Sequence, residues 1–467
     1  MRSFVTSYLL LLAAPAFGQS DPRVELGLVS PEVMEGSRLF FSEMFDGNGR
    51  TCGTCHLAES NTTIEPADIR ALPMDAPLFA LNVPGLEHAS FIRLGLVLEN
   101  VDGFQRDPAF RSVPHTLSLA TSIISNKDQA PGTHAVGWSS DGATAPGTLR
   151  DFATGAVIQH FPRSLARVPG VDFRLPTDAE LDAMLAFQMQ LGRTADIDLR
   201  DVRFTDPQAE RGRPFYLDAI NNNCQRCHGD ASANRGVDGG GPEFVAPGVP
   251  TGNQAKDTNV DATRLGSVPP DHGRGFPGDD QFSPPPLIEA ADSGPFFHTN
   301  SIFDVESAVR FYTTAVGLFS GQQQTFGEDR VQDLGAVLRA LNASFNAQLA
   351  LQRIEAAQAI IVAGFGDHPS VGELLDLAAE EAEDGMHVLR SPDTKHAAVK
   401  LSVCETLARN ASRANKPAKH GQQIEQARSA CVAANEALGT GLTMQLGVGN
   451  LAMRSSRFQP SRDALSR

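Results

Sequence analysis

The sequence predicts a mainly α-helical protein in which two similar units stand in tandem, followed by a helical extension. Three observations lead to this prediction. The pentapeptide Cys-x-x-Cys-His occurs twice, at 52–56 and 224–228. Each copy lies between a segment typical of an opening helix and a segment typical of a closing helix. After about Asn346 the composition shifts to Ala, Glu and Lys with helical periodicity, and no third copy follows.

The two pentapeptides predict two covalently bound c-type haems. In each, two thiols can add to the vinyl groups of a haem, and the adjacent His can ligate its iron. A Cys-x-x-Cys pair alone is also typical of a zinc half-site or a dithiol redox site, but neither explains both histidines. With 6 Cys and 12 His in 467 residues, random placement gives such a pentapeptide roughly 0.002 times per chain. We therefore assign haem attachment to Cys52, Cys55, Cys224 and Cys227, and iron ligation to His56 and His228.

Each pentapeptide is framed by two predicted helices. Ser30 can cap a helix with Pro31 at its first position, and Asp206-Pro207 begins the equivalent helix of the second unit. Thr177-x-x-Glu180 is a capping box that opens an apolar-periodic helix stopping near Gly192. Its counterpart has 3-4 spacing through Val331, Leu334, Val337, Leu338 and Leu341. Helix, haem motif, long loops and closing helix is the plan of a class I cytochrome c domain, here in two copies.

The expected organisation has four parts. These are a signal peptide at 1–18, a first cytochrome c domain at 19–200, a second at 201–345 and a helical C-terminal extension at 346–467. Between Gly229 and Pro286, Gly, Pro and Asp are too frequent for helix or strand. Alone, such a stretch is typical of a disordered linker, but a cofactor can organise long loops that have little core of their own. The extension, with helical patterns at 373–383 and 418–437, is expected to have a structural or docking role.

The first 18 residues have the pattern of a secretory signal. Arg2 is positive, Leu9 to Ala14 lie in a short apolar core, and Ala16 and Gly18 are small residues at the −3 and −1 positions. The apolar run is far below the ~20 residues that a membrane anchor needs. We therefore expect a periplasmic protein without a membrane span, which agrees with haem attachment outside the cytoplasm.

An oxidising compartment also permits disulfides. Haem attachment leaves Cys404 and Cys431 over, so we predict that they pair; two buried free thiols are the alternative. The formal charge of −16 disfavours binding to nucleic acid or anionic membranes and can steer a basic protein partner.

Function depends on whether the face of each iron opposite its His is open or closed. No Met occurs between Met189 and Met386, so a His/Met second site built from its own domain is excluded. The remaining candidates for the sixth ligand of the second haem are His272, His298 and Tyr312.

Segments 281–287, 294–300 and 309–312 resemble, in order, the second-haem region of the bacterial di-haem cytochrome c peroxidase superfamily. In the first half, Arg111 to Leu117 is similar to the family's Arg-Asn-x-Pro-x-Leu segment. Trp138-Ser-Ser-Asp-Gly, followed by Leu149, resembles its Trp-Asp-Gly-Arg segment. The resemblance spans residues 30–345 and does not cover the tail.

The resemblance implies a role for several residues. His56 would be the proximal ligand of the substrate-reactive haem, and His228 that of the electron-transfer haem. The sixth ligand of the second haem falls on Tyr312, where many of the peroxidases have Met. Tyr there resembles the branch that contains the di-haem enzyme completing tryptophan tryptophylquinone in a partner protein. A phenolate is a hard anionic donor that favours ferric iron.

Further roles come from the same resemblance. Trp138, the one Trp of the chain, would be read as a core residue by default, but it matches the family's inter-haem Trp and is implied as an electron relay. His298 matches a pocket or inter-haem residue, and ligation of the second iron by two histidines through it is the main alternative to Tyr312. The family holds calcium between its domains through backbone carbonyls, which implies Ser293 and Pro295. The other loop histidines, His88, His115 and His134, are read as ordinary loop residues, with a redox-sensitive distal ligand as the alternative for one of them.

The distal side of the first haem departs from the family, which has Gln and Glu there. Phe152 stands at the Gln position, Gln159 and His160 fall around the Glu position, and Asp151 is out of register. His160 could replace Glu as a proton shuttle, ligate the iron, or be a plain core or surface histidine. An apolar pocket with Phe152 would suit dioxygen or an organic substrate better than peroxide.

The leading expectation is a periplasmic di-haem oxidoreductase of the peroxidase type. It would reduce hydrogen peroxide or a related oxidant above His56, with electrons passing through the second haem and Trp138. A small electron-donor protein, a cytochrome or a cupredoxin, would restore them. The alternatives are a di-haem oxygenase or cofactor-maturing enzyme acting on an organic or protein substrate, and a non-enzymatic di-haem electron carrier.

Overall fold

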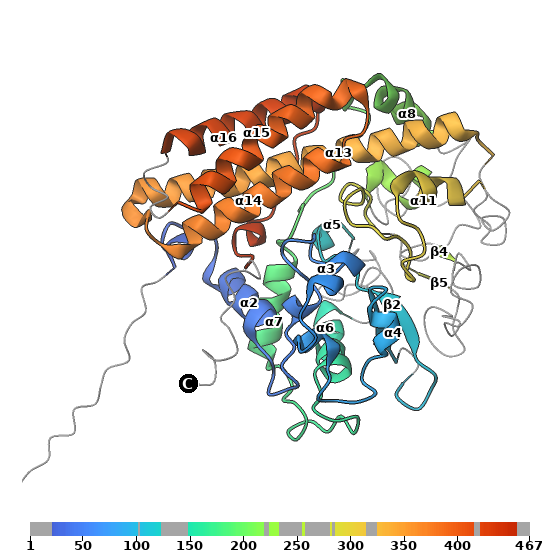
Figure 1. The fold of residues 1–467 in the computed structure, drawn as a ribbon, viewed down its shortest axis with the longest axis vertical. Helices are drawn as coiled ribbons and strands as arrows, with labels where there is room; N and C mark the ends of the chain where they lie inside the picture. Colours follow the sequence, from blue (N-terminus) through green and yellow to red (C-terminus); the bar gives the residue numbers. More distant parts are fainter. Residues whose placement is uncertain are drawn as a thin grey trace, which may run out of the picture.

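The computed structural model describes a mainly helical protein (Figure 1). The described residues are 21–100, 103–122, 148–218, 224–232, 255–256, 281–282, 285–313, 325–414 and 421–454. The segment 1–18, His134, Trp138 and His272 lie outside them.

The elements follow each other in a simple order. The first part of the chain contains α1 (Pro22–Glu25), α2 (Pro31–Ser42), η1 (Cys52–Thr54), α3 (Pro66–Ala71), η2 (Pro77–Phe79), α4 (Ala89–Ile92), β1 (Leu96–Glu99), β2 (Ala109–Ser112), α5 (Leu119–Ser122), α6 (Leu149–His160) and α7 (Asp178–Gln188). The middle part contains β3 (Arg203–Phe204), α8 (Pro207–Leu217), α9 (Cys224–Cys227), η3 (Gly229–Ala231), β4 (Ala255–Lys256), β5 (Gln281–Phe282) and α11 (Val305–Phe311). The last part contains α13 (Glu328–Ile360), η5 (Ile361–Phe365), α14 (Pro369–Val388), η6 (Pro392–Thr394), α15 (Lys395–Ser412), α16 (Gly421–Leu438), β6 (Gly439–Thr440) and η8 (Val448–Leu451).

The predicted opening and closing helices are confirmed, and each opening helix packs on its closing helix. Ser30 accepts a hydrogen bond from the Val33 amide at the start of α2, and Thr177 forms the predicted capping box of α7. The pair α2–α7 has its counterpart in the pair α8–α13. The closing helix of the first unit ends at Gln188, and Gly192 follows with a φ of +66°.

A glycine lies at each of the two helix crossings. A Cβ on Gly36 would stand 2.0 Å from the carbonyl oxygen of Ala183, and a Cβ on Gly212 would stand 2.3 Å from that of Asp333. Both helix pairs therefore approach more closely than any residue with a side chain allows. The sequence repeat thus corresponds to a repeated helix crossing.

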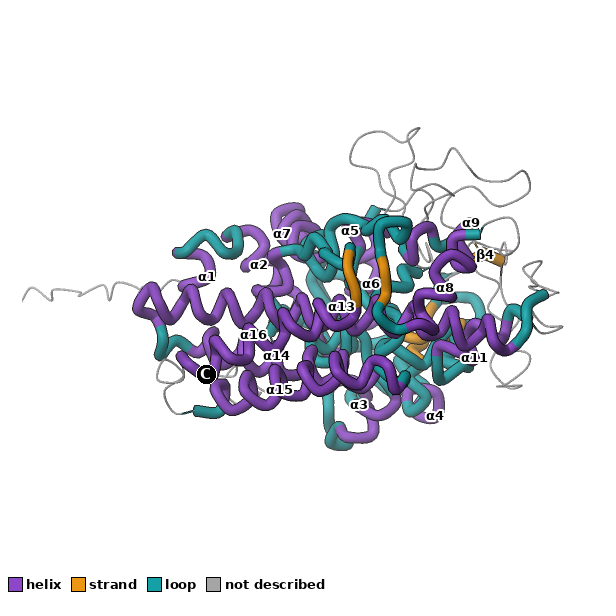
Figure 2. Tube along the Cα trace, turned by 90° about the horizontal axis from the view of Figure 1, so that it is seen from above, coloured by secondary structure: helices purple, strands orange, loops and turns teal. Residues whose placement is uncertain are grey.

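The extension forms a four-helix bundle with α13, shown along the top of Figure 1 and side by side in Figure 2. In this bundle α13 packs on α14 and α16, and α15 also packs on α14 and α16. The boundary that we expected between 345 and 346 falls inside α13, which closes the second unit at its start and joins the bundle along its length. The predicted disulfide Cys404–Cys431 is present and connects α15 to α16, with the Cα atoms 5.5 Å apart.

The segment 439–454, after α16, contacts both the start of the second unit and the first unit. Strand β6 pairs with β3, with Thr440 opposite Arg203, and the side chain of Asn450 bonds both the amide and the carbonyl of Gly192. Ser37 of α2 donates to the carbonyl of Ala452. The bundle and the first unit are therefore joined by the tail as well as by the chain that runs between them.

Sheet structure is limited to short pairs in the described part of the chain. Leu96 pairs with Ser112 in the β1–β2 hairpin. We expected neither helix nor strand between 229 and 286, but β4 and β5 form a two-residue ladder there, with Ala255 opposite Phe282. This is a correction, since backbone pairing does not need the side-chain pattern on which the expectation rested. No helix in the described residues has the length and apolar character to cross a bilayer.

Candidate haem-binding sites

The first pentapeptide lies on η1, directly against the opening helix of its unit. Gly53 is required by close packing, since a Cβ there would stand 2.5 Å from Cδ1 of Phe41. The His56 ring lies 5.7 Å from the ring of Phe40, centroid to centroid. Nδ1 of His56 lies 2.6 Å from the carbonyl oxygen of Thr62. Because a carbonyl only accepts, Nδ1 carries the hydrogen, and the lone pair of Nε2 can bind a metal.

The second pentapeptide repeats this arrangement on α9. Nδ1 of His228 donates to the carbonyl of Pro285 at 2.8 Å. The hydroxyl of Tyr216, on the opening helix α8, donates to the carbonyl of His228 at 2.7 Å. Both predicted iron ligands therefore have the same tautomer and the same kind of backbone anchor, a detail that no sequence pattern records.

Electrostatics keep both rings in the form that a metal needs. Burial lowers the pKa of His56 to about 4, with smaller contributions from the nearby His160 and His115. Burial likewise lowers the pKa of His228 to about 4. Both rings are thus neutral at neutral pH, as metal ligation requires.

The residues around the first motif fit a bound haem. Cys52 and Cys55 are not joined in a disulfide, and burial raises the pKa of their thiols to about 12 and about 11. Close by, Nδ1 of His115 and Oγ1 of Thr116 are buried and have no hydrogen-bond partner among the described residues. Orphaned buried polar atoms of this kind are costly without a partner. A haem bound at the first motif, whose edge is polar, is therefore chemically compatible with these side chains.

His160, at the end of α6, lies next to two carboxylates. Its Nε2 is 2.9 Å from Oε1 of Glu99 on β1, and its Nδ1 is 3.9 Å from Oε1 of Glu87. Its carbonyl accepts from Nδ2 of Asn48 at 2.9 Å and from Nη1 of Arg50 at 3.3 Å. These contacts hold His160 against the residues just before the first motif.

Arg50 connects this group to the loop after the motif. Its guanidinium pairs with Glu87 at 2.8 Å, and the side chains of both are almost completely buried. The sequence position that matches the family's Glu holds no carboxylate, and Asp151 is out of register. Glu99 and Glu87 come instead from an earlier strand and loop, which no motif had marked.

Gln159 and Phe152 have structural contacts. The Gln159 amide donates to the carbonyl of Leu98 at 3.1 Å and to the side chain of Asn100 at 3.0 Å, and the residue is buried. Phe152, two turns earlier on α6, packs in a small cluster with Leu149 and Leu185. The structure thus brings His160, rather than these two, next to ionisable groups.

The candidates for the far side of the second haem lie close to each other. Tyr312 caps the end of α11, and its ring lies 6.3 Å from that of Phe297. His298, the next residue after Phe297, is 9 % exposed, and its carbonyl accepts from the Ser112 amide of β2 at 2.7 Å. Both Tyr312 and His298 stay predictions as ligands.

The remaining site predictions concern a cation. Ser293 donates through its hydroxyl to the carbonyl of Glu289 at 2.8 Å, and Gly294–Pro295 is a cis peptide. Within the described ranges, no three His, Cys, Asp or Glu side chains are arranged to hold a metal ion. Calcium bound by the carbonyls of Ser293 and Pro295 remains a prediction.

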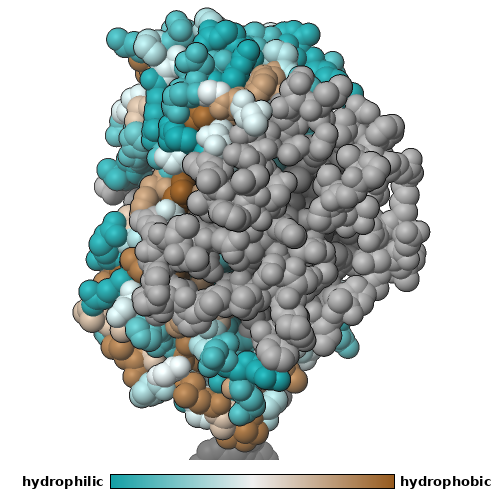
Figure 3. All heavy atoms as spheres, turned by 90° about the vertical axis from the view of Figure 1, so that its right-hand side faces the viewer, coloured by the Kyte–Doolittle hydropathy of each residue, from teal (hydrophilic) through white to brown (hydrophobic). Residues whose placement is uncertain are grey.

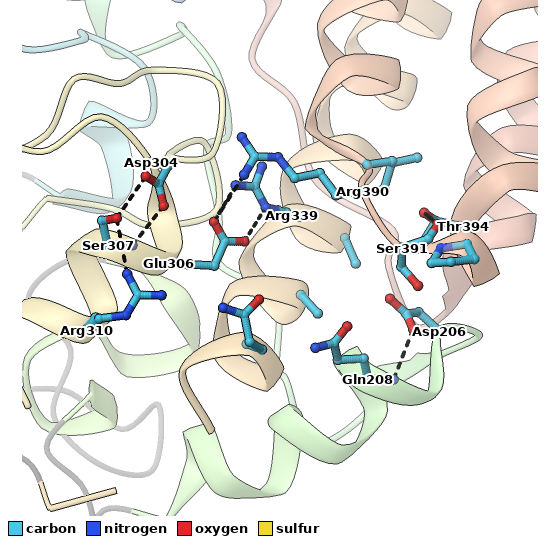
Figure 4. Close-up of a pocket in the computed structure, with 15 residues that line it drawn as sticks. Asp206, Gln208, Asp304, Glu306, Ser307, Arg310, Arg339, Arg390, Ser391 and Thr394 are labelled. Atoms are coloured by element: carbon cyan, nitrogen blue, oxygen red, sulfur yellow. Dashed lines mark hydrogen bonds and ion pairs between the residues drawn. The ribbon is translucent and has the colours of Figure 1, made fainter. Parts of the chain in front are cut away.

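A cavity of about 500 Å³ lies elsewhere, between α8, α11, α13 and the segment 389–394. Figure 4 shows Arg339 and Arg390 both directed at Glu306. Arg339 holds both oxygens of Glu306 at 2.6 Å, and Arg390 lies at 3.5 Å. The lining contains none of the predicted site residues, and Glu306 is paired with both Arg339 and Arg390.

Comparison with known proteins gives little further information. No family model matches the chain, and no curated protein matches it. Among solved structures, a similar chain is that of a crystal structure of a MauG-like protein associated with microbial copper homeostasis. It is 16 % identical, with a TM-score of 0.38, over 66 % of this chain and 88 % of that chain. Similarity of this degree supports no argument about activity, so function is argued from the residues of this chain.

Proposed function

We propose that the protein is a periplasmic di-haem c oxidoreductase of the cytochrome c peroxidase superfamily. It reduces hydrogen peroxide, or a related oxidant, at the first haem with electrons passed through the second. The observation that supports this most directly is that both Cys-x-x-Cys-His motifs present a neutral His whose Nδ1 is bound to a backbone carbonyl. When bound, the haems supply the electron-transfer and oxidant-activating chemistry.

The chain's own residues fix the geometry of each site. Cys52 and Cys55 would hold the first haem, and Cys224 and Cys227 the second. His56 and His228 would bind the irons through Nε2, since the carbonyls of Thr62 and Pro285 hold the opposite ring nitrogens. Tyr312 would be the sixth ligand of the second haem, and Trp138 would serve as the electron relay.

His160 manages protons at the first site. Reducing one peroxide to two waters consumes two electrons and two protons. The Glu99 carboxylate lies 2.9 Å from Nε2 of His160 and orients the imidazole for proton transfer. Gln159, held by the backbone of β1, keeps the end of α6 in place. Phe152 is further from the ionisable group and bounds the apolar side of α6.

Spectroscopy and turnover together test the proposal. Electron paramagnetic resonance of the purified holoprotein should show one iron that binds cyanide in the fully ferric or the half-reduced state. Peroxide should be consumed with a reduced small redox protein as donor. If both irons were six-coordinate and low-spin in both states, and neither bound cyanide, the protein would be an electron carrier and not an enzyme.

One observation favours a second candidate, a di-haem enzyme acting on a protein substrate. The loop that follows His160 exposes Leu165, Val168, Val171 and Leu175, each more than 40 % accessible. Figure 3 shows hydrophobic side chains gathered at the lower end of the molecule, where Figure 1 places this loop. Exposed apolar patches of this kind are typical of protein contacts.

A double variant of the loop separates the two candidates. Val168→Ser/Val171→Ser should leave peroxide reduction with an artificial small-molecule donor unchanged. If a protein substrate docks on the loop, oxidation of that substrate should fall severalfold in the variant. Equal rates with wild type and variant for every candidate protein would remove this second function.

A further inference from the structure

One buried ion pair lies at the meeting point of the segments that hold the two iron ligands. The side chains of Arg193 and Glu289 are both 0 % exposed. Arg193 donates through Nε to Oε1 of Glu289, and its Nη2 lies 3.3 Å from Oε2. Its Nη1 donates to Asp196 at 2.9 Å. The three side chains together carry one net negative charge in a region shielded from water.

On the side of the first motif, the pair is connected to His56 in three steps. The Ser118 hydroxyl donates to Oε1 of Glu289 at 2.5 Å. Two residues earlier, the Thr116 amide donates to Oγ1 of Thr62 at 2.8 Å. The carbonyl of Thr62 is the acceptor for Nδ1 of His56. Glu289 therefore holds the segment 116–118 in place. This segment in turn holds Thr62, whose carbonyl accepts from His56.

On the side of the second motif, the connection runs along two routes. Glu289 lies four residues after Pro285, whose carbonyl accepts from Nδ1 of His228. Ser232, four residues after His228, donates to the Asp196 carboxylate that Arg193 also binds. The residues that hold His228 on both sides are therefore connected to the same cluster of Arg193, Glu289 and Asp196.

We propose that Glu289 and Arg193 are positioning residues shared by both haem sites, and that their cluster sets the reduction potentials of both irons together. The inference rests on the proposed function in taking both haems as bound. A fixed negative charge stabilises ferric over ferrous iron, and in a buried region it is only weakly screened. Burial of such a pair is expensive in desolvation, so stability alone does not account for it.

The test compares Glu289→Gln with a matched control, Glu381→Gln. Glu381 pairs with Arg353 at 2.8 Å, and both side chains are again buried, but this pair joins α13 to α14. Reductive titrations of the two holoproteins, followed by absorbance and electron paramagnetic resonance, give the potential of each haem. For Glu289→Gln we expect the ferrous-to-ferric ratio at fixed potential to rise about tenfold at both haems, equivalent to 59 mV per one-electron couple. Glu381→Gln should change neither ratio.

Two milder variants leave the charge of the cluster unchanged, and each interrupts its connection to one of the two motifs. Ser118→Ala should alter the resonance of the haem at His56 alone, and Ser232→Ala that of the haem at His228 alone. They also serve if Glu289→Gln fails to fold. If Glu289→Gln folds, unchanged potentials in it, or equal shifts in the control, would overturn the inference. If Glu289→Gln does not fold, unchanged resonances in both serine variants would overturn it. Because no oxidant is used, failure of peroxide turnover would affect the proposed function and leave this result intact.

Discussion

The imidazole of His160 obtains its chemical partner from a residue 61 positions earlier in the chain. By sequence alone His160 had three readings: proton shuttle, iron ligand or ordinary histidine. The contact between Nε2 and Glu99 at 2.9 Å agrees with the first reading, because a carboxylate partner orients an imidazole for proton transfer, and the role of His160 stays a prediction. Nδ1 lies 3.9 Å from Oε1 of Glu87, so a carboxylate stands near each ring nitrogen.

Replacing Glu99 by Gln should therefore lower peroxide turnover by about 10- to 100-fold, the usual cost of removing the partner that orients a catalytic histidine. The variant keeps the size of the side chain but removes its charge. Steady-state rates with an artificial donor measure the effect, and Glu355→Gln, at an exposed pair with Arg428 in the bundle, is the control. Equal rates in Glu99→Gln and wild type would exclude a role for the His160–Glu99 pair in peroxide turnover.

Glu65 gives the protein a pH-dependent stability. Burial raises the pKa of Glu65 to about 7, from an ordinary value of 4.5. The folded state therefore binds more protons than the unfolded state between these values, and the free energy of unfolding falls as the pH rises from 4.5 to 7.

In Glu65→Gln this contribution is absent, so the variant should gain stability relative to wild type as the pH rises through that window. Denaturant unfolding at about pH 5 and about pH 7, near the two ends of the window, measures both proteins. Parallel stability profiles would show that Glu65 does not titrate in this range.

At the scale of elements, the two glycine crossings define the repeat. The α2–α7 and α8–α13 pairs place backbone against backbone at Gly36 and Gly212. Helix caps and apolar periodicity were enough to predict all four helices, because both are local properties of the chain. The crossing itself was not predicted, because a glycine within a helix does not by itself indicate a close contact with another helix.

Gly36→Ala and Gly212→Ala should each lower the free energy of unfolding by about 1–3 kcal/mol, because the new methyl group overlaps a carbonyl of the facing helix. Gly155→Ala is the matched control. That glycine is also helical, on α6, but a Cβ added to it would meet no atom within 4 Å. There the higher helix propensity of Ala should stabilise the protein by about 0.5–1 kcal/mol. Thermal unfolding of the three variants would contradict this argument if all three changed alike.

At the scale of the whole molecule, the extension is continuous with the second unit. Helix α13 belongs to both, and the tail after α16 bonds to Gly192 and to Ser37 of the first unit. The bundle and the tail together therefore contact both halves of the protein, and a structural or docking role for the extension stays a prediction.

The disulfide should contribute to stability without affecting the haems. Removing it in Cys404→Ala/Cys431→Ala frees a loop spanning 27 residues, and we expect a loss of about 3 kcal/mol in the free energy of unfolding. Guanidinium unfolding measures the loss, and the haem absorbance spectrum is the control. A changed spectrum in the folded variant would mean that the bundle acts on the haem sites directly.

The sequence by itself determined the helices that frame the two predicted attachment motifs and the pairing of the last two cysteines. The helices depend on residues that are close together in the chain. The disulfide follows from the two cysteines that remain, in an oxidising compartment, after the two motifs take four. Only the tertiary structure decided what surrounds the ligands: Glu99 beside His160, the carbonyls of Thr62 and Pro285 on the two histidines, and Glu289 with Arg193 between them. The physical reason is that these contacts join distant segments, and backbone carbonyls, which every residue has, leave no trace in the order of side chains.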